Sequence, residues 1–233
     1  ATWISDQSLF CISPQSFNAT GTRIRLTGNA VDYTNETLSY QYFQDPHCLD
    51  VNILNGPVNG NTEIVVSGTG FINSTSLLCR FGEVVVPISA YFNDTHIMCN
   101  SPAHAAGDVC LDVSNNGVDF TSDCIRYTYY EGPWVESISP QHGPLSGETL
   151  VTINGKRLNG TSTYCKFGES KIVMATSSSY GVAECRSPPH SAGYVAIEIS
   201  HNGIDFSTSG VQFLFTGSAV VTGIYPSSGS ESG

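Results

Sequence analysis

Short runs of alternating apolar and polar residues, separated by Gly, Pro and Asn, dominate the chain. In residues 109–113 and 195–199 every second residue is Val, Leu or Ile. Alternation with a period of two is typical of a β-strand with one buried face, and no stretch shows the period of a helix. The pattern predicts an all-β protein built from antiparallel sandwiches of about seven short strands each.

The strand pattern occurs twice, with an offset of 86 or 87 residues. Residues 56–60 match 143–147, residues 79–83 match 165–169, residues 99–102 match 185–188, and residues 116–120 match 202–206. Residues 11–14, 29–33 and 40–42 match the second half of a unit, and residues 223–229 match 137–143. The repeat therefore predicts a half-unit in residues 1–45, complete units in 46–132 and 133–218, and the first strand of a further unit in 219–233.

Several landmarks of the unit follow one another in a fixed order. They are Ser137-Ile138-Ser139-Pro140, Gly143-Pro144, Cys165-x-Phe167-Gly168, Cys185-x-Ser187-Pro188 and Asn202-Gly203-x-Asp205-Phe206. The order resembles the IPT/TIG domains, immunoglobulin-like modules of plexins, hepatocyte-growth-factor-receptor-like ectodomains, fibrocystin-like proteins and some transcription factors. The resemblance covers nearly the whole chain and implies tandem immunoglobulin-like β-sandwiches in a linear array. It implies no single function, because one fold hosts many functions.

Four of the eight cysteines occupy matching positions in the two complete units. Cys79 and Cys99 are 20 residues apart, as are Cys165 and Cys185. Each cysteine shares strand parity with apolar residues of the expected core. We therefore expect two buried disulfides, Cys79–Cys99 and Cys165–Cys185.

Cys110 and Cys124 exist only in the first complete unit, and their counterparts in the second are both other residues. We interpret Asn116-Gly117, like Asn202-Gly203, as a type I′ hairpin turn rather than a ligand site. One bulge residue beside this turn would place Cys110 opposite Cys124. Parity with the outward residues Asp112 and Arg126 predicts this third disulfide on the solvent face of the hairpin.

Cys11 has two candidate disulfide partners. Cys48 lies near the first junction and is the favoured partner, and the other candidate is a cysteine outside the chain. A zinc site is the alternative to disulfides, but no Cys-x-x-Cys spacing occurs.

Five Asn-x-Ser/Thr sequons predict N-linked glycans at Asn18, Asn35, Asn73, Asn93 and Asn159. Those at Asn73 and Asn159 fall at the same position of the two complete units, in a loop between strands. Sequons and disulfides together indicate a secreted or cell-surface protein.

The charge balance excludes some partners. The chain has 9 Lys and Arg against 20 Asp and Glu, a formal net charge of -11. This charge repels phosphate backbones and anionic membrane surfaces, so no nucleic acid is expected as a partner. No run approaches the 18 apolar residues of a membrane span, and no secretory leader is recognisable.

We expect no enzymatic activity, no metal and no cofactor. The six histidines lack metal-binding spacing, and no nucleophile elbow, phosphate-binding loop or dinucleotide motif occurs. His104 and His190 follow Ser-Pro at the same position of each unit and are interpreted as parts of a common loop. Asp119 and Asp205 recur in the Asn-Gly hairpins and are interpreted as caps of their own turns rather than calcium ligands.

The linker between the complete units is only Glu131-Gly132-Pro133, which limits bending and places Trp134 at the joint. We expect a semi-rigid rod. The half-unit would expose apolar residues such as Ile4 and Phe10, which no soluble protein can leave bare. Either this segment belongs to a longer array of repeats, or strands of another copy complete it, with residues 219–233 as the candidate donor.

Three functions are therefore weighed. The first is an extracellular structural glycoprotein, a rod that continues head to tail through other copies or adjoining repeats into a surface fibril or filament. The alternative is the ectodomain of a cell-surface receptor that binds or adheres to a protein ligand. A module that positions a catalytic domain is the third.

Overall fold

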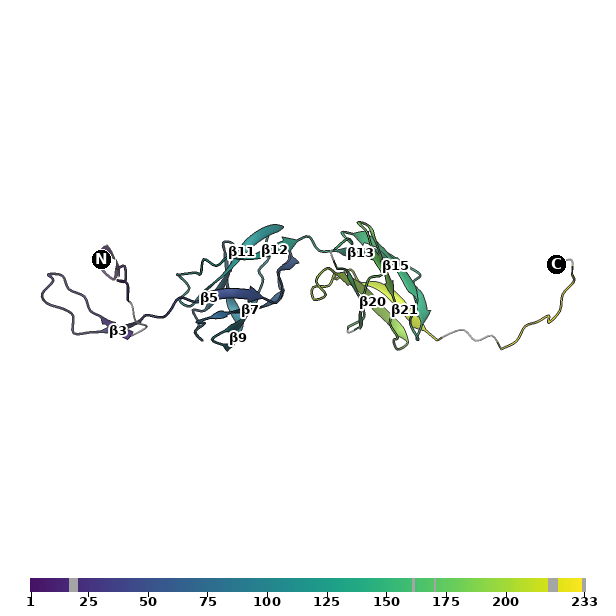
Figure 1. The fold of residues 1–233 in the computed structure, drawn as a ribbon, viewed down its shortest axis with the longest axis horizontal. Helices are drawn as coiled ribbons and strands as arrows, with labels where there is room; N and C mark the ends of the chain where they lie inside the picture. Colours follow the sequence, from purple (N-terminus) through teal and green to yellow (C-terminus); the bar gives the residue numbers. More distant parts are fainter. Residues whose placement is uncertain (17–20, 161, 170, 218–221, 232–233) are drawn as a thin grey trace.

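The computed structural model describes residues 1–16, 21–160, 162–169, 171–217 and 222–231. In these residues it consists of β-strands and contains no helix, so none is present that could cross a membrane. Two β-sandwiches lie end to end, with two hairpins before the first and an extended segment after the second (Figure 1). The expected all-β architecture is confirmed.

The first complete unit contains one continuous sheet that folds over its own core. Its strands follow the order β5-β7-β10-β9-β8-β11-β12-β6. The bounds are β5 (His47–Val51), β6 (Asn55–Pro57), β7 (Glu63–Thr69), β8 (Leu78–Phe81), β9 (Val84–Asn93), β10 (His96–Asn100), β11 (Gly107–Ser114) and β12 (Ile125–Tyr130). Because β9 pairs with both β10 and β8, it joins the two layers of the sandwich.

The second complete unit has two separate sheets, ordered β13-β15-β19-β18 and β14-β21-β20-β16-β17. The bounds are β13 (Trp134–Ser139), β14 (His142–Pro144), β15 (Leu150–Lys156), β16 (Tyr164–Phe167), β17 (Lys171–Met174), β18 (Ser177–Ser178), β19 (Val182–Arg186), β20 (Gly193–Ser200) and β21 (Val211–Thr216). The strand equivalent to β9 is divided here into β17 and β18. Each of the two pieces lies at the end of its sheet.

Both cores are built from the same positions of the repeat. Phe81 packs edge-to-face on Tyr127 with ring centroids 5.5 Å apart, and Phe167 packs on Phe213 in the same way at 5.8 Å. Such ring pairs contribute about 1 kcal/mol beyond the apolar area that they bury. The core disulfides Cys79–Cys99 and Cys165–Cys185 lie beside these rings, and none of the four cysteines is exposed.

The third expected disulfide, Cys110–Cys124, is also present, but the predicted strand register is wrong. Cys110 faces Arg126 across the ladder, not Cys124. The backbone N–H of Thr121 still bonds the Val113 carbonyl at 2.9 Å, so the register shifts only between Thr121 and the start of β12. Cys124 has a positive φ of 52° in this bulge. The bulge, which alternation does not encode, therefore brings the two sulfur atoms together.

The type I′ assignment of the Asn-Gly turns is also wrong. Gly117 and Gly203 have positive φ of 75° and 76°, whereas Asn116 and Asn202 are not among the described residues with positive φ. The Asn116 side chain instead accepts hydrogen bonds from the N–H groups of Val118 and Asp119, both at 2.9 Å. Asparagine stabilises its own turn in this way, so only the glycine needs the left-handed conformation.

Asp112, expected on the outer face, is buried. Its carboxylate accepts hydrogen bonds from the Cys124 N–H at 3.2 Å and the Thr121 hydroxyl at 3.3 Å, and pairs with Arg80 at 3.0 Å. Glu198 is buried at the same position of the second unit, where it accepts the N–H groups of Ser209 and Gly210. The bulge turns its N–H groups inward, and a buried carboxylate satisfies them.

The half-unit folds as two isolated hairpins, β1 (Thr2–Ser5) with β2 (Ser8–Phe10) and β3 (Gly21–Ile24) with β4 (Leu38–Gln41). Its Tyr40 and Tyr42 rings meet edge-to-face at 5.1 Å, as Tyr127 and Tyr129 do at 5.0 Å. The sequence therefore forms the local geometry of the unit without its other half. Its apolar side chains remain uncovered, and Ile4 and Phe10 are 61% and 57% exposed.

Residues 222–231 form no strand, unlike the expected first strand of a further unit. The equivalent strand β13 pairs along its length with β15. No such partner lies beside residues 222–231 in the part of the chain that the structure describes. A single strand without a ladder has no backbone hydrogen bonds to hold it extended.

Candidate functional site: the joint between the two complete units

The joint is the contact between the end of the first complete unit and the beginning of the second. A crevice of about 700 Å³ opens there. Its lining includes the linker residues 131–133, Trp134 and the turns 57–61 and 204–208. Trp134 is 46% exposed, so the ring lies at the joint as expected but is only half covered.

One turn of the second unit docks onto the first. The Thr62 hydroxyl, which is fully buried, donates to Asp205 Oδ2 at 2.8 Å, and the Asn202 side-chain amide donates to the same oxygen at 2.7 Å. Asn202 also lies 3.4 Å from the Asn55 carbonyl oxygen. Asp205 therefore caps its own turn, as Asp119 does, and in addition accepts a hydrogen bond across the joint.

The same turn is undocked elsewhere in the chain. Asn29 and Asp32 in the half-unit, and Asn116 and Asp119 in the first unit, repeat the side-chain bond of Asn202 and Asp205. Asp32 and Asp119 are exposed, whereas Asp205 is half-buried. The turn is thus formed locally, and the hydroxyl of Thr62 is what distinguishes the docked copy.

Charged and aromatic side chains surround this contact. Arg157 pairs with Glu131 of the linker at 3.5 Å, and the His201 ring lies 5.7 Å from that of Tyr130. Burial raises the pKa of Tyr130, and the nearby Asp205 carboxylate adds to the shift. Burial also lowers the pKa of His201, partly opposed by its hydrogen bond to the Arg157 carbonyl. Neutral forms of both rings are therefore favoured at the joint.

Replacing Thr62 with Val should loosen the joint. The substitution keeps the shape but removes a hydrogen bond to a carboxylate, which typically contributes about 2 kcal/mol. We expect a wider distribution of angles between the two units in electron micrographs of single molecules. Thr149 is the equivalent residue of the second unit and is half-exposed, so Thr149→Val is the matched control. Equal distributions for the two variants would contradict a role of Thr62 in the joint.

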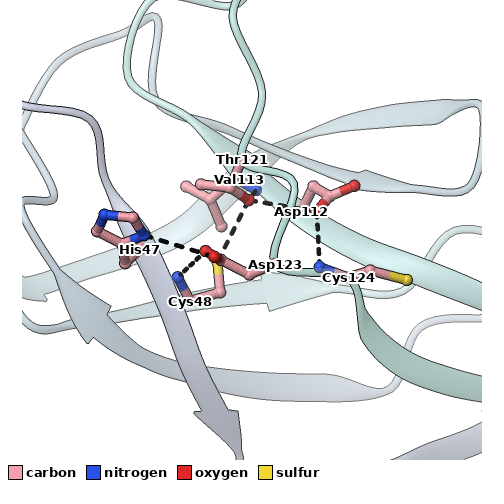
Figure 2. A network of polar contacts seen from close by, with 7 residues as sticks. All are labelled: His47, Cys48, Asp112, Val113, Thr121, Asp123 and Cys124. Atoms are coloured by element: carbon pink, nitrogen blue, oxygen red, sulfur yellow. Dashed lines mark hydrogen bonds and ion pairs between the residues drawn. The ribbon is translucent and has the colours of Figure 1, made fainter.

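A second polar network ties β5 to the hairpin loop of the first unit (Figure 2). Asp123 accepts the N–H of Cys48 at 2.7 Å and lies 3.4 Å from His47 Nδ1. The Cys48 sulfur lies 3.8 Å from the Thr121 hydroxyl oxygen. Burial raises the pKa of the Cys48 thiol to about 12, so almost none of the reactive thiolate forms at neutral pH. These groups hold the strand and do not form a nucleophilic site.

The expected bond between Cys11 and Cys48 is absent. Cys11 is exposed and Cys48 is buried, and each carries a free thiol. Cys48 occupies the position of Val135, whose N–H is held by the Ser209 hydroxyl at 2.9 Å just as Asp123 holds Cys48. Cys48 is therefore a small core residue that is directed inward, away from any partner at the surface.

The sequons lie on the surface where the structure describes them. Asn35, Asn73, Asn93 and Asn159 are exposed, and Asn18 lies outside the described residues. Asn73 and Asn159 lie in the loops after β7 and β15, as expected from the repeat. The two histidines of the common loop stack on core rings, His104 on Tyr129 at 4.9 Å and His190 on Phe215 at 4.8 Å. Their rings cover the core.

Sequence reasoning missed the docked turn and the buried acids. The sequence does contain a signal for the buried acids. An acidic residue occurs at the same position of both units and is followed nine residues later by a hydroxyl residue. No group of three or more His, Cys, Asp or Glu side chains that could hold a metal occurs among the described residues.

Comparisons with known proteins agree with this architecture. Fibrocystin-L of Mus musculus is 25% identical over 189 residues, which is 81% of this chain and 4% of that protein. Plexin-A3 of Rattus norvegicus is 25% identical over 197 residues, 78% of this chain and 10% of that protein. The extracellular region of Plexin A4, domains 1 to 10, has a TM-score of 0.49 at 15% identity and covers 86% of this chain and 18% of that one.

The chain thus spans a tenth or less of the length of these curated relatives. The model of the IPT/TIG domain matches residues 46–129 and 133–215, which include both complete units. The landmarks recognised in the sequence are therefore those of the family. The chain belongs to the IPT/TIG domain family and carries two of its immunoglobulin-like β-sandwiches in tandem.

Proposed function

We propose that the chain is part of the ectodomain of a cell-surface receptor and that its second complete unit binds a protein ligand along the strand β17. The disulfides and the exposed sequons support the extracellular location. The structural fibril, the first hypothesis from the sequence, draws no support from the relatives. The receptor hypothesis replaces it.

The open edge of the second unit carries this proposal. In the first unit β9 is paired on both sides, so its backbone groups are occupied. Among the described residues of the second unit, β17 pairs only with β16, and β18 pairs only with β19. An edge strand presents unpaired N–H and C=O groups to which an extended segment of another protein can add as a further strand.

Apolar side chains accompany this edge. Ile172 is 49% exposed, Met174 is 62% exposed and Tyr180 is 74% exposed. Exposed apolar residues on or near an open edge are typical of a protein interaction surface, and methionine adapts to partners of different shape. The net charge of -11 favours a ligand with a basic surface.

Replacing Ile172 and Met174 together with Glu should weaken ligand binding strongly. Binding is measured with a fluorescently labelled tetramer of the chain on intact cells, because four linked copies bind with higher avidity than one. We expect the double variant to bind about tenfold less than the parent, because two apolar anchors become charged. Val85→Glu is the matched control, since Val85 is 45% exposed on the fully paired β9.

Equal binding by the double variant and the parent would overturn the assignment of β17. Electron microscopy of the same purified protein tests the rejected hypothesis at the same time. Separate short rods are expected of a receptor segment. Continuous head-to-tail filaments would instead restore the structural fibril.

A further inference from the structure

The crevice at the joint has no occupant in the proposed receptor function, although its lining is well suited to a sugar. Trp134 presents a half-exposed ring, and Lys156, Arg157 and Glu131 surround it with charged groups that donate and accept hydrogen bonds. A sugar ring has apolar C–H faces and polar hydroxyls at its rim. Binding sites of this mixed kind occur preferentially between domains.

A sequon begins two residues after the crevice lining, on a loop that His201 of the same unit contacts. Asn159 comes two residues after Arg157, which lines the crevice. His201 Nε2 donates to the Arg157 carbonyl oxygen at 2.8 Å. A Cβ atom on Gly160 would lie 2.3 Å from His201 Nδ1, so the loop packs flat on the imidazole ring and tolerates only glycine there. The backbone at Asn159 is therefore fixed next to the joint.

The Asn159 side chain itself is accessible. It is exposed, and its amide makes no hydrogen bond within the described residues. Asn73 occupies the same loop of the first unit and is exposed as well. Its loop begins beside residues 13–16 of the half-unit, where the described residues form no complete sandwich. The two sequons therefore have the same local chemistry and different surroundings.

We propose that Asn159 carries an N-linked glycan whose first sugars fold back over the joint and pack on Trp134. In the attachment step the amide nitrogen of Asn159 bonds to C1 of a lipid-linked oligosaccharide, the lipid diphosphate leaves, and the nitrogen loses one proton. Arg157 and Glu131 hydrogen-bond the sugar hydroxyls at the rim. The glycan thereby fills the crevice and limits bending between the two units. The inference rests on the extracellular location given above.

Fluorescence quenching of Trp134 tests the packing. The chain has two tryptophans, so Trp3→Phe leaves Trp134 as the only reporter. The protein is secreted from eukaryotic cells, and acrylamide quenching is measured before and after the glycans are removed enzymatically under native conditions. We expect the glycan to lower the quenching constant to about half, because it covers the exposed part of the ring.

Asn159→Gln should quench like the deglycosylated protein, whereas Asn73→Gln should keep the protection. Equal quenching of Asn159→Gln and the parent would overturn the inference, as would a peptide map with glycans at Asn73 and Asn93 but none at Asn159. Either result leaves ligand binding along β17 untouched. A protein without a glycan at any sequon would instead remove a main support of the extracellular location.

Discussion

Replacing Cys165 and Cys185 together with Ala is expected to lower the free energy of unfolding of the second complete unit by about 3 kcal/mol. The bond closes a loop with a sequence separation of 20 and joins the two layers of the sandwich. Without it the unfolded chain gains conformational entropy, and the fully buried sulfur atoms leave a cavity in the core. The loss is measured by the hydrogen exchange of amides in residues 133–217 at increasing denaturant concentration.

Cys11→Ala is the control for this double variant. Cys11 is exposed and carries a free thiol, so its removal should leave the unfolding transitions of both complete units unchanged. A loss confined to the second unit is expected, because the first unit keeps its own disulfide between Cys79 and Cys99. If the double variant unfolded at the same denaturant concentration as the parent, the bond would not stabilise the sandwich.

Glu198→Ala should destabilise the second unit by a similar amount, about 3 kcal/mol. Its buried carboxylate accepts the N–H groups of Ser209 at 2.8 Å and Gly210 at 2.7 Å, and also the hydroxyl of Ser207. These hydrogen bonds are partly buried, and a donor left without a partner away from water costs about 1–3 kcal/mol. Thermal unfolding of the variant should show a lower midpoint for the second unit only.

Two further variants separate this effect from a change in net charge. Glu198→Gln keeps one oxygen acceptor and should lose less stability than Glu198→Ala. Glu169→Ala removes an exposed carboxylate from the same unit and should change the midpoint little. An equal midpoint for Glu198→Ala and Glu169→Ala would show that the bulge does not depend on the carboxylate.

The Cys165–Cys185 disulfide and the Glu198 carboxylate matter for the proposed function because the edge strand β17 needs a rigid support. The disulfide fixes β16, through Cys165, against β19, through Cys185. The strand β17 pairs with β16 alone, so its position depends on how firmly β16 is held. Loss of either stabilising element should therefore weaken ligand binding as well as stability.

The division of the β9 equivalent shows a difference that the repeat conceals. Residues 87–92, which hold the equivalent positions of β9, are Pro-Ile-Ser-Ala-Tyr-Phe and include branched and aromatic side chains that favour a strand. Residues 174–179 are Met-Ala-Thr-Ser-Ser-Ser, which have a weaker preference. The chain accordingly forms one strand of ten residues in the first unit and two short strands in the second. The candidate binding edge depends on this local difference.

The sequence by itself determined the fold class, the two complete units and the two core disulfides. Alternation with a period of two sets which side chains are buried, and a repeat at fixed spacing locates equivalent cysteines, because both follow from regular strand geometry. The resemblance to the IPT/TIG family rested on landmarks of the same kind. All of these properties are recorded in spacing along the chain.

Only the tertiary structure decided the strand register at Cys124, the burial of Asp112 and the contact between Thr62 and Asp205. A bulge interrupts the alternation on which parity arguments depend, so Asp112 lies inside although its neighbours predict the opposite. Thr62 and Asp205 are 143 residues apart, and their contact exists because a short linker brings two folded units together. Such a contact depends on how two finished surfaces meet, which spacing within one unit does not record.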